Sequence, residues 1–252
     1  MLFSEIYGSR LDDKLGTADR TQRFTTAKRK QYANDGQRKF NELTGCYQKR
    51  LTVSLTDQSS GPFETDIEAL ATDFCWPAAT TVSLKRVGTD TSYVEGPDLE
   101  VVTEETLNNI DPNWRAASPG TPQYVYWRND GGARYLGLHP APDVPAGETW
   151  TLLLPYVATP PDMSADSDEP FGASAPRITL RPYHDAVLFY AAAECELLRK
   201  DVEKHEYWMK RFAGEVARYT GTQAPKSGQA IRLAINYRRR RVARVYDPTR
   251  WP

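Results

Sequence analysis

The C-terminal stretch of the sequence concentrates the side chains best suited to binding chemistry. Between residues 226 and 252, eight basic residues stand against one acid, so this stretch carries a formal charge of +7 and the remainder of the chain carries −8. Guanidinium groups pair with carboxylates or phosphates, and aromatic anchors beside them add buried apolar area. We therefore predict docking on an acidic protein groove, with nucleic-acid binding and a solvated tail as alternatives. The docking residues are Tyr237, Arg238, Arg239, Arg240, Arg241, Arg244, Tyr246 and Trp251.

Residue types that perform catalysis in other proteins occur here without the spacing that catalysis requires. The sequence has no glycine-rich phosphate loop with a Walker lysine and no Gly-x-Ser-x-Gly nucleophile elbow. Its three histidines, His139, His184 and His205, occupy unrelated contexts, although the last two become neighbours if their helices fold back on each other. A packed or solvated imidazole is the favoured interpretation for each. We predict no catalytic residue and no enzymatic activity.

Metal-binding patterns are also missing from the sequence. The acidic stretch at 162–169 lacks the glycine and the bidentate glutamate of a calcium loop, so we predict a solvated, mobile loop there. The cysteines Cys46, Cys75 and Cys195 lie too far apart for a zinc knuckle or a disulfide framework. The sequence therefore predicts buried or idle thiols, no metal site and no cofactor.

Aromatic residues are plentiful in the middle of the chain. Such residues form a stacking platform for bases or sugars in some proteins. More often they fill a small β core or an interface between subunits, which is the favoured interpretation here. The set comprises Trp76, Trp114, Tyr124, Tyr126, Trp127, Tyr135, Trp150 and Tyr156.

Two regions carry the 3.6-residue apolar period of α-helices. The first begins at Asp19 or Thr25 and is expected to stop at Gly45. The second runs from residue 182 and is too long for one typical helix, so we predict a break before Asp201, which caps the next piece. Gly221 is the predicted end of that piece. Since the first helix cannot bury its apolar stripe alone, we expect the N- and C-terminal helices to pack together.

The region between these helices has the two-residue period of β-strands. Leu51, Val53 and Leu55 alternate with polar residues, and turn signals such as Gly96-Pro97 separate further candidate strands. The segment 129–132, Asn-Asp-Gly-Gly, lies between two aromatic-rich runs and is the best hairpin signal. A short helix is expected over 104–110. The pattern predicts an antiparallel β module over 50–160.

These elements predict an α+β fold in which a helical bundle, built from the N- and C-terminal helices, carries an inserted antiparallel β module and an extended basic C-terminal tail. The expected parts are 1–49 (N-terminal helical segment), 50–160 (β module), 161–221 (helices completing the bundle) and 222–252 (tail). No apolar run approaches the roughly 20 residues that cross a bilayer, and residues 1–12 lack the pattern of a secretory signal. We therefore expect no membrane partner and synthesis in the cytoplasm.

The order and spacing of several segments resemble the head-to-tail adaptor, or head-completion, proteins of tailed bacteriophages, especially those of short-tailed phages. The resemblance covers about residues 30–219 and does not include the basic tail. It rests on 30–40 (KQYANDGQRKF), 111–114 (DPNW) with 118–124 (SPGTPQY), 138–143 (LHPAPD), 154–156 (LPY) with 160–162 (PPD), and 183–193 (YHDAVLFYAAA).

The resemblance implies a structural virion protein without enzymatic activity or cofactor. Such a protein forms a ring beneath the portal, commonly a dodecamer, in the neck between capsid and tail. It extends the channel through which the packaged DNA passes and docks a tail or nozzle protein. In this setting the portal protein is the expected acidic partner of the 226–252 segment. The alternatives are a nucleic-acid-binding protein acting through its arginine-rich tail and a carbohydrate-binding module using the β-region aromatics.

Overall fold

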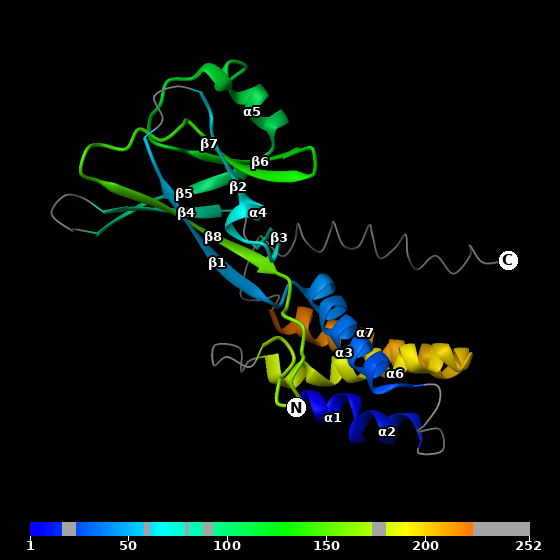
Figure 1. The fold of residues 1–252 in the computed structure, drawn as a ribbon. Helices are drawn as coiled ribbons and strands as arrows, with labels where there is room; N and C mark the ends of the chain where they lie inside the picture. The colour runs from blue at the N-terminus through cyan, green and yellow to red at the C-terminus, as the bar shows by residue number, and fades with distance from the viewer. Residues whose placement is uncertain (17–23, 58–60, 79–80, 88–92, 173–179, 224–252) are drawn as a thin grey trace. The chain divides into compact units, whose positions relative to one another are not determined.

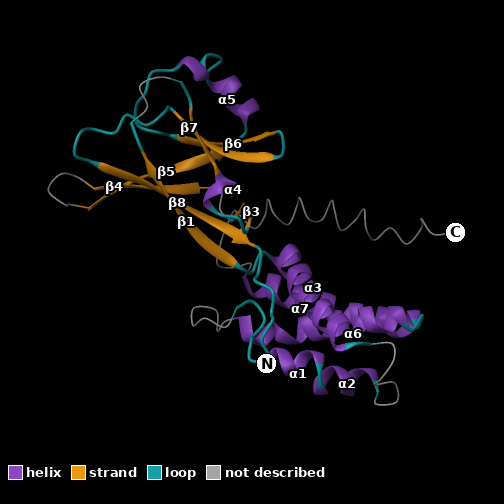
Figure 2. Ribbon diagram, in the orientation of Figure 1, coloured by secondary structure: helices purple, strands orange, loops and turns teal. Residues whose placement is uncertain are grey.

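The computed structural model describes residues 1–16, 24–57, 61–78, 81–87, 93–172 and 180–223, and these belong to two compact units. Unit 1 comprises Met1–Tyr47 and Thr159–Pro252, and unit 2 comprises Gln48–Ala158. The described part of unit 1 is built from helices, whereas strands dominate unit 2 (Figure 2).

The helices of unit 1 are α1 (Phe3–Tyr7), α2 (Ser9–Leu15), α3 (Thr26–Thr44), α6 (His184–Leu198) and α7 (Val202–Gln223), as labelled in Figure 1. Unit 2 contains the short helices α4 (Ile67–Leu70) and α5 (Glu104–Ile110) and the 3-10 turn η2 (Trp114–Ala116). Its strands are β1 (Gln48–Leu55), β2 (Phe63–Asp66), β3 (Phe74–Pro77), β4 (Thr81–Val87), β5 (Tyr93–Val102), β6 (Tyr124–Asp130), β7 (Ala133–His139) and β8 (Thr149–Ala158).

Helix α3 begins and ends where its sequence signals predict. The Thr25 hydroxyl accepts a hydrogen bond from the Lys28 N–H, which confirms Thr25 as the N-cap. Gly45 ends the helix in the left-handed conformation that glycine adopts at little cost. Gly36 lies where α3 crosses α6, and a Cβ added there would be 3.0 Å from the Val187 carbonyl oxygen. The predicted packing of the N- and C-terminal helices is thereby confirmed, and the missing side chain allows their close approach.

Helices α6 and α7 form an antiparallel hairpin with the predicted break (Figure 1). Lys200 adopts a positive φ of 62°, and the Asp201 carboxylate accepts a hydrogen bond from the Lys204 N–H at 3.0 Å, which caps α7. The expected stop at Gly221 was wrong, because α7 continues to Gln223. A Cβ at Gly221 would touch nothing, so this exposed glycine costs the helix only about 1 kcal/mol of propensity and does not end it.

The core of unit 1 is centred on the ring of Phe40, which has no exposed surface. Four aromatic rings surround it at centroid distances of 5.6 to 6.3 Å. They belong to Phe171, Tyr183, Phe212 and Tyr219, which come from the loop before α6, the residue preceding α6, and α7. The Phe40 side chain of α3 thus packs against residues from segments that are distant in the sequence.

Unit 2 corrects the predicted fold class. Its eight strands form a single curled sheet, a half-barrel, in the order β1-β8-β4-β5-β6-β7-β2, with β3 also paired to β8. The chain is therefore a mixed α+β protein with an eight-stranded sheet, and the predicted fold class, a helical bundle with an inserted antiparallel β module, was wrong. The purely antiparallel arrangement was also wrong, because β5 and β6 pair in parallel. Parallel neighbours need a crossover connection, and here the crossover contains α5 and η2.

One of the predicted turn signals lies inside a strand. Strand β5 runs through Gly96-Pro97, where its register against β4 shifts between Ser83 and Lys85. A Cβ at Gly96 would lie 2.6 Å from the Leu84 carbonyl oxygen, so the bulge requires glycine. The hairpin predicted at 129–132 is confirmed, since β6 and β7 pair around Gly131 and Gly132, both at positive φ. The short helix expected at 104–110 is confirmed as α5.

Candidate interaction surface

The docking segment predicted at the C-terminus lies outside the described residues. All eight side chains from Tyr237 to Trp251 belong to the stretch 224–252, on which the structure gives no information. Their role stays a prediction that rests on composition and charge alone.

His184 and His205 lie apart rather than together. His184 opens α6 and is 3 % exposed, with its Nδ1 atom 3.3 Å from the N-terminal amine. The Nδ1 atom of His205 lies 3.0 Å from the carbonyl oxygen of Ala193, nine residues further along α6. Nine residues of helix correspond to roughly 13 Å, so the hairpin does not pair the two imidazoles.

Burial of His184 leads to a pH-dependent stability. Burial, reinforced by the nearby N-terminal charge, lowers the pKa of His184 from 6.5 to about 4, although Glu169 opposes the shift. The unfolded chain binds this proton below about pH 6.5, whereas the folded chain binds it only near pH 4. The stability contributed by the neutral imidazole is therefore complete above pH 6.5 and is lost as the pH falls toward 4.

We expect the substitution His184→Gln to remove this pH-dependent contribution to stability. Between pH 7 and pH 4, the free energy of unfolding of the native chain should fall by about 3 kcal/mol more than that of the variant. Urea unfolding at both pH values measures the difference. Equal losses in the two proteins would show that His184 does not titrate as its surroundings indicate.

His139 is a packed imidazole in unit 2. It is 7 % exposed and lies between the rings of Trp114 and Tyr124, at centroid distances of 6.2 and 6.3 Å. Burial lowers its pKa, and the carboxylate of Asp111, 3.9 Å from Nε2, opposes that shift. Within the described ranges, no group of three His, Cys, Asp or Glu side chains is arranged to hold a metal ion.

The aromatic residues of the β region mostly fill the core of unit 2. Four of them, Trp114, Tyr126, Trp150 and Tyr156, are at most 4 % exposed. The Tyr126 ring covers Gly137 so closely that a side chain at that glycine would overlap it, and its hydroxyl donates to Glu64 at 3.0 Å. Half-buried neighbours extend the same core, including Trp127, whose ring packs at a tilt against Phe74 with 5.4 Å between ring centroids. These four buried rings offer no face for a base or a sugar to stack on.

The acidic stretch at 162–169 is exposed but structurally engaged. Asp166 accepts hydrogen bonds from Tyr7 Oη at 2.6 Å and Lys30 Nζ at 3.2 Å, and these partners lower the pKa of its carboxyl group. Glu169 pairs with Arg181 at 3.0 Å. The backbone of the stretch also accepts from α1, since Phe3 N–H donates to the Asp168 carbonyl oxygen. The stretch is solvated, as predicted, but the prediction did not include the contacts of its carboxylates, which tie α1 and α3 to the segment before α6.

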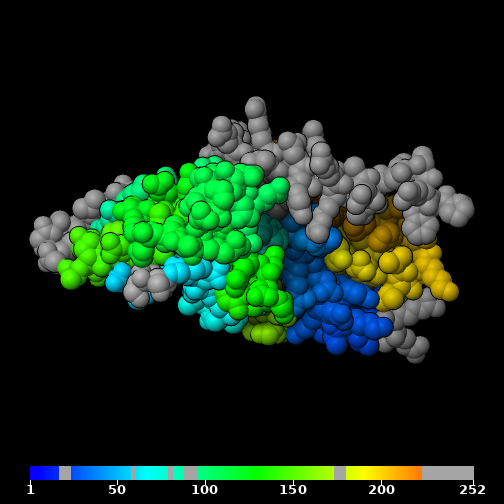
Figure 3. All heavy atoms as spheres, turned by 90° about the horizontal axis from the view of Figure 1, so that it is seen from above, coloured from blue at the N-terminus to red at the C-terminus, as the bar shows by residue number. Residues whose placement is uncertain are grey.

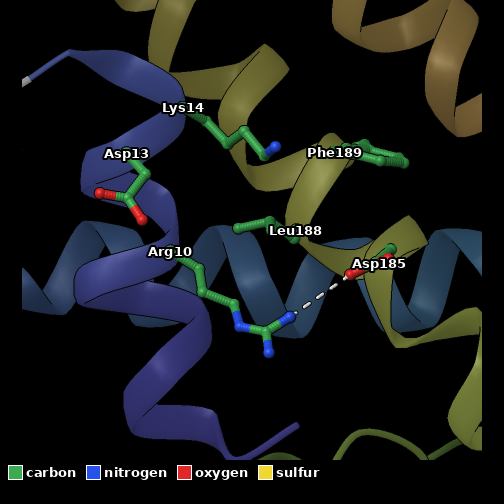
Figure 4. A pocket seen from close by; sticks show the side chains of 6 residues that line it. All are labelled: Arg10, Asp13, Lys14, Asp185, Leu188 and Phe189. Carbon is green, nitrogen blue, oxygen red and sulfur yellow. Dashed lines mark ion pairs between the residues drawn. The ribbon is translucent and has the colours of Figure 1, made fainter.

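A hollow of about 290 Å³ lies on unit 1 between α2 and α6 (Figure 4). Leu188 and Phe189 of α6 line it, and charged residues of both signs surround them. Arg10 reaches toward Asp185 at 3.8 Å, with both side chains about half exposed. The remaining lining residues are Asp13 and Lys14 of α2. Four of the six lining residues are charged and Leu188 is only 2 % exposed, so the hollow presents mostly charged surface.

The hollow was not predicted from the sequence because α2, which lines one side of it, and the preceding helix α1 were not predicted. Their buried residues Phe3, Ile6, Leu11 and Leu15 are spaced three and four apart within each helix, which is a helical signal. The signal is short, since each helix has only two such residues. Gly8 separates the two helices and breaks the period.

Comparison with models of known protein families shows to which family this chain belongs. A family model for the SU10 adaptor protein matches residues 1–241. The chain belongs to this adaptor family. The family resemblance noted from the sequence is therefore confirmed, and with it a structural role in a bacteriophage.

The adaptor match corrects the expected extent of the resemblance. It includes α1 and α2 and continues past the expected limit of residue 219 as far as Arg241. No curated protein matches the adaptor chain. Among its described helices, none is both long enough and apolar enough to cross a membrane.

Proposed function

We propose that this adaptor is a structural subunit of the virion neck, where identical copies form a ring of about twelve beneath the portal protein. The ring extends the channel for the packaged DNA and presents a docking surface to a tail or nozzle protein. The family match over residues 1–241 carries this proposal.

The chemistry of the described residues supports a role in assembly. The histidines are packed or bonded to backbone, and burial raises the pKa of the Cys195 thiol to about 12, so that thiol stays protonated and unreactive. The accessible features are instead the exposed apolar side chains Leu197, Leu198 and Val202, where α6 connects to α7, and a hollow with a charged lining, which suit protein contacts.

We further propose that 226–252 anchors each copy to the portal. Its charge of +7 supports an acidic partner, and its aromatic residues supply apolar anchors. Direct nucleic-acid binding is the second candidate for this segment, because the same charge attracts phosphates. Carbohydrate binding has less support, since four of the aromatic residues on which it depends are buried.

A conditional loss of the chain tests the proposed function. Particles made without it should contain packaged DNA but lack attached tails, and supplying the chain to purified tailless heads should restore tail attachment. Electron microscopy and infectivity titres measure both steps. Normal tail attachment without the chain would overturn the neck role, and loss of packaging before head maturation would indicate a different function.

A further inference from the structure

Charge is divided unequally between the parts of the chain. Unit 2 has fifteen acidic and seven basic residues, which gives it a formal charge of −8, whereas the segment 226–252 carries +7. The chain as a whole carries −1, so the rest of unit 1 is neutral in sum. Opposite charges attract, so unit 2 is the acidic surface within this chain that the basic segment matches.

The sheet face that carries α5 is one place where this charge is uncovered. Val102 and Tyr126 lie opposite each other on β5 and β6 and are buried against α5 and η2. Side chains two residues apart on a strand share a face, so the preceding pair, Glu100 and Tyr124, continues this face. Here the cover ends, since Glu100 is exposed, Tyr124 is only half-buried, and Asp98 is exposed next to them. The helix α5 and these strands contribute to the green surface turned toward the viewer in Figure 3.

An exposed apolar side chain adjoins these carboxylates. The Tyr124 ring stacks on His139 with 6.3 Å between centroids, and the Asp111 carboxylate lies 3.9 Å from Nε2 of His139. Ile110, which precedes Asp111 at the end of α5, is 50 % exposed. Burial lowers the pKa of His139, so the imidazole is uncharged at neutral pH and does not compensate Asp111. We call this surface the α5 shoulder, and it comprises Asp98, Glu100, Ile110, Asp111 and Tyr124.

The described cations of unit 2 leave the shoulder acidic. The Asp98 carboxylate accepts a hydrogen bond from the Ser83 hydroxyl at 2.8 Å, and neither Asp98 nor Glu100 has an ion-pair partner among the described residues. Arg115 lies instead 3.7 Å from Glu104. The other cations are Lys49, Arg128 and Arg134, which pair with other carboxylates, Arg50 on β1, and Lys85 and Arg86 on β4.

We propose that in the free chain the segment 226–252 binds the α5 shoulder of the same copy, and that the portal displaces it during assembly. The segment brings arginines and aromatic rings, which suit a surface of carboxylates with an exposed apolar side chain. Exposed ion pairs are individually weak, but tethering gives the segment an effective concentration on the order of millimolar at its own chain. Only the displacement step rests on the proposed function.

The contact keeps the basic segment from other acidic partners before the neck is built. A stretch with a charge of +7 binds nucleic acid without regard to sequence, and a bacterial cell contains DNA and RNA in excess. Holding the segment on unit 2 lowers that competing binding. A portal that engages many copies at once then outcompetes a single tethered site.

Photo-crosslinking of the full chain tests the contact. With p-benzoylphenylalanine in place of Tyr246, irradiation of the free protein should link the segment to peptides of β5 and β6, within one chain on a denaturing gel. The pair Asp98→Asn and Glu100→Gln should lower this yield about tenfold, the upper range for losing two exposed ion pairs. Glu203→Gln with Glu206→Gln removes the same charge from exposed positions of α7 and should leave the yield unchanged.

Saturating portal rings should abolish the crosslink. Crosslinks confined to unit 1, or formed mainly between two chains, would overturn the inference while leaving portal docking of the segment intact. A crosslink to unit 2 that persists on saturated portals would overturn the displacement step and count against portal docking itself.

Nucleic-acid binding gives an independent measurement. At low salt, the Asp98→Asn, Glu100→Gln variant should bind a short DNA duplex at least about threefold more tightly than the Glu203→Gln, Glu206→Gln variant, because its basic segment is released. Both variants have the same net charge, so a general electrostatic effect does not produce the difference. All four positions are exposed, so thermal melting should match that of the native chain. Equal DNA affinities in two well-folded variants would show that the shoulder does not hold the segment.

Discussion

The substitution Phe40→Ala is expected to destabilise unit 1 by about 3–5 kcal/mol. The Phe40 side chain has no exposed surface, and its neighbours include Tyr219 at 5.8 Å and Phe171 at 5.6 Å between ring centroids. Removing the ring takes apolar area out of the core and leaves a cavity. The surrounding rings are anchored on separate helices and a loop, so they cannot close that cavity without moving backbone.

Thermal unfolding and hydrogen exchange measure this effect. The transition of unit 1 should move down on the order of 10 °C, with protection lost in peptides from α3, α6 and α7. Tyr207→Ala is the matched control, because it removes an aromatic ring that is 47 % exposed on the same unit and should change stability by less than about 1 kcal/mol. Similar shifts for both variants would show that Phe40 does not centre the core.

The parts of the fold that sequence predicted are those set by local interactions. The start of α3 at Thr25 and the break before Asp201 each depend on one side chain bonding to backbone three residues away, so short-range patterns suffice. The β6–β7 hairpin is similarly local, because its two glycines supply the positive φ angles that its turn requires.

The sheet depends on contacts between distant segments, and this is why its topology was missed. Strand β1 pairs with β8, about a hundred residues later, and β5 pairs in parallel with β6 across α5. Neither pairing leaves a trace in a single sequence. The four-residue strands β2 and β3 are too short to show alternation, and Gly96-Pro97 has the composition of a turn although it forms a bulge.

The candidate interaction surface also has a part that is visible in the local sequence and a part that depends on contacts between distant segments. The abundance of arginine at 226–252 is visible in composition, but the hollow requires α2 and α6 to be side by side. The contacts of the acidic stretch were missed for the same reason, since Tyr7 and Lys30, the partners of Asp166, lie more than a hundred residues away. Spacing predicts which side chains share a helix, whereas assembly of the unit decides which of them meet.

Deletion of residues 226–252 is expected to abolish binding of the adaptor to portal rings that contain no DNA. Each exposed arginine–carboxylate pair contributes only about 0–1 kcal/mol, whereas a buried aromatic anchor such as Trp251 contributes about 2 kcal/mol or more. A ring presents every copy of the segment at once, so these contacts reinforce each other through high effective concentration. Loss of the segment should therefore eliminate binding rather than weaken it slightly.

Replacing Arg238–Arg241 by alanine separates charge from apolar anchoring. We expect at least tenfold weaker portal binding at low salt and a smaller difference at high salt, because exposed ion pairs are screened. Removing exposed lysines elsewhere, with Lys28→Ala and Lys210→Ala, is the matched control and should leave binding unchanged.

The competing hypothesis is that the arginines face the channel and contact DNA phosphates. If the truncated chain binds DNA-free portals normally, the docking role is wrong, and a salt-dependent loss of DNA binding in the same variant would then assign the segment to the channel.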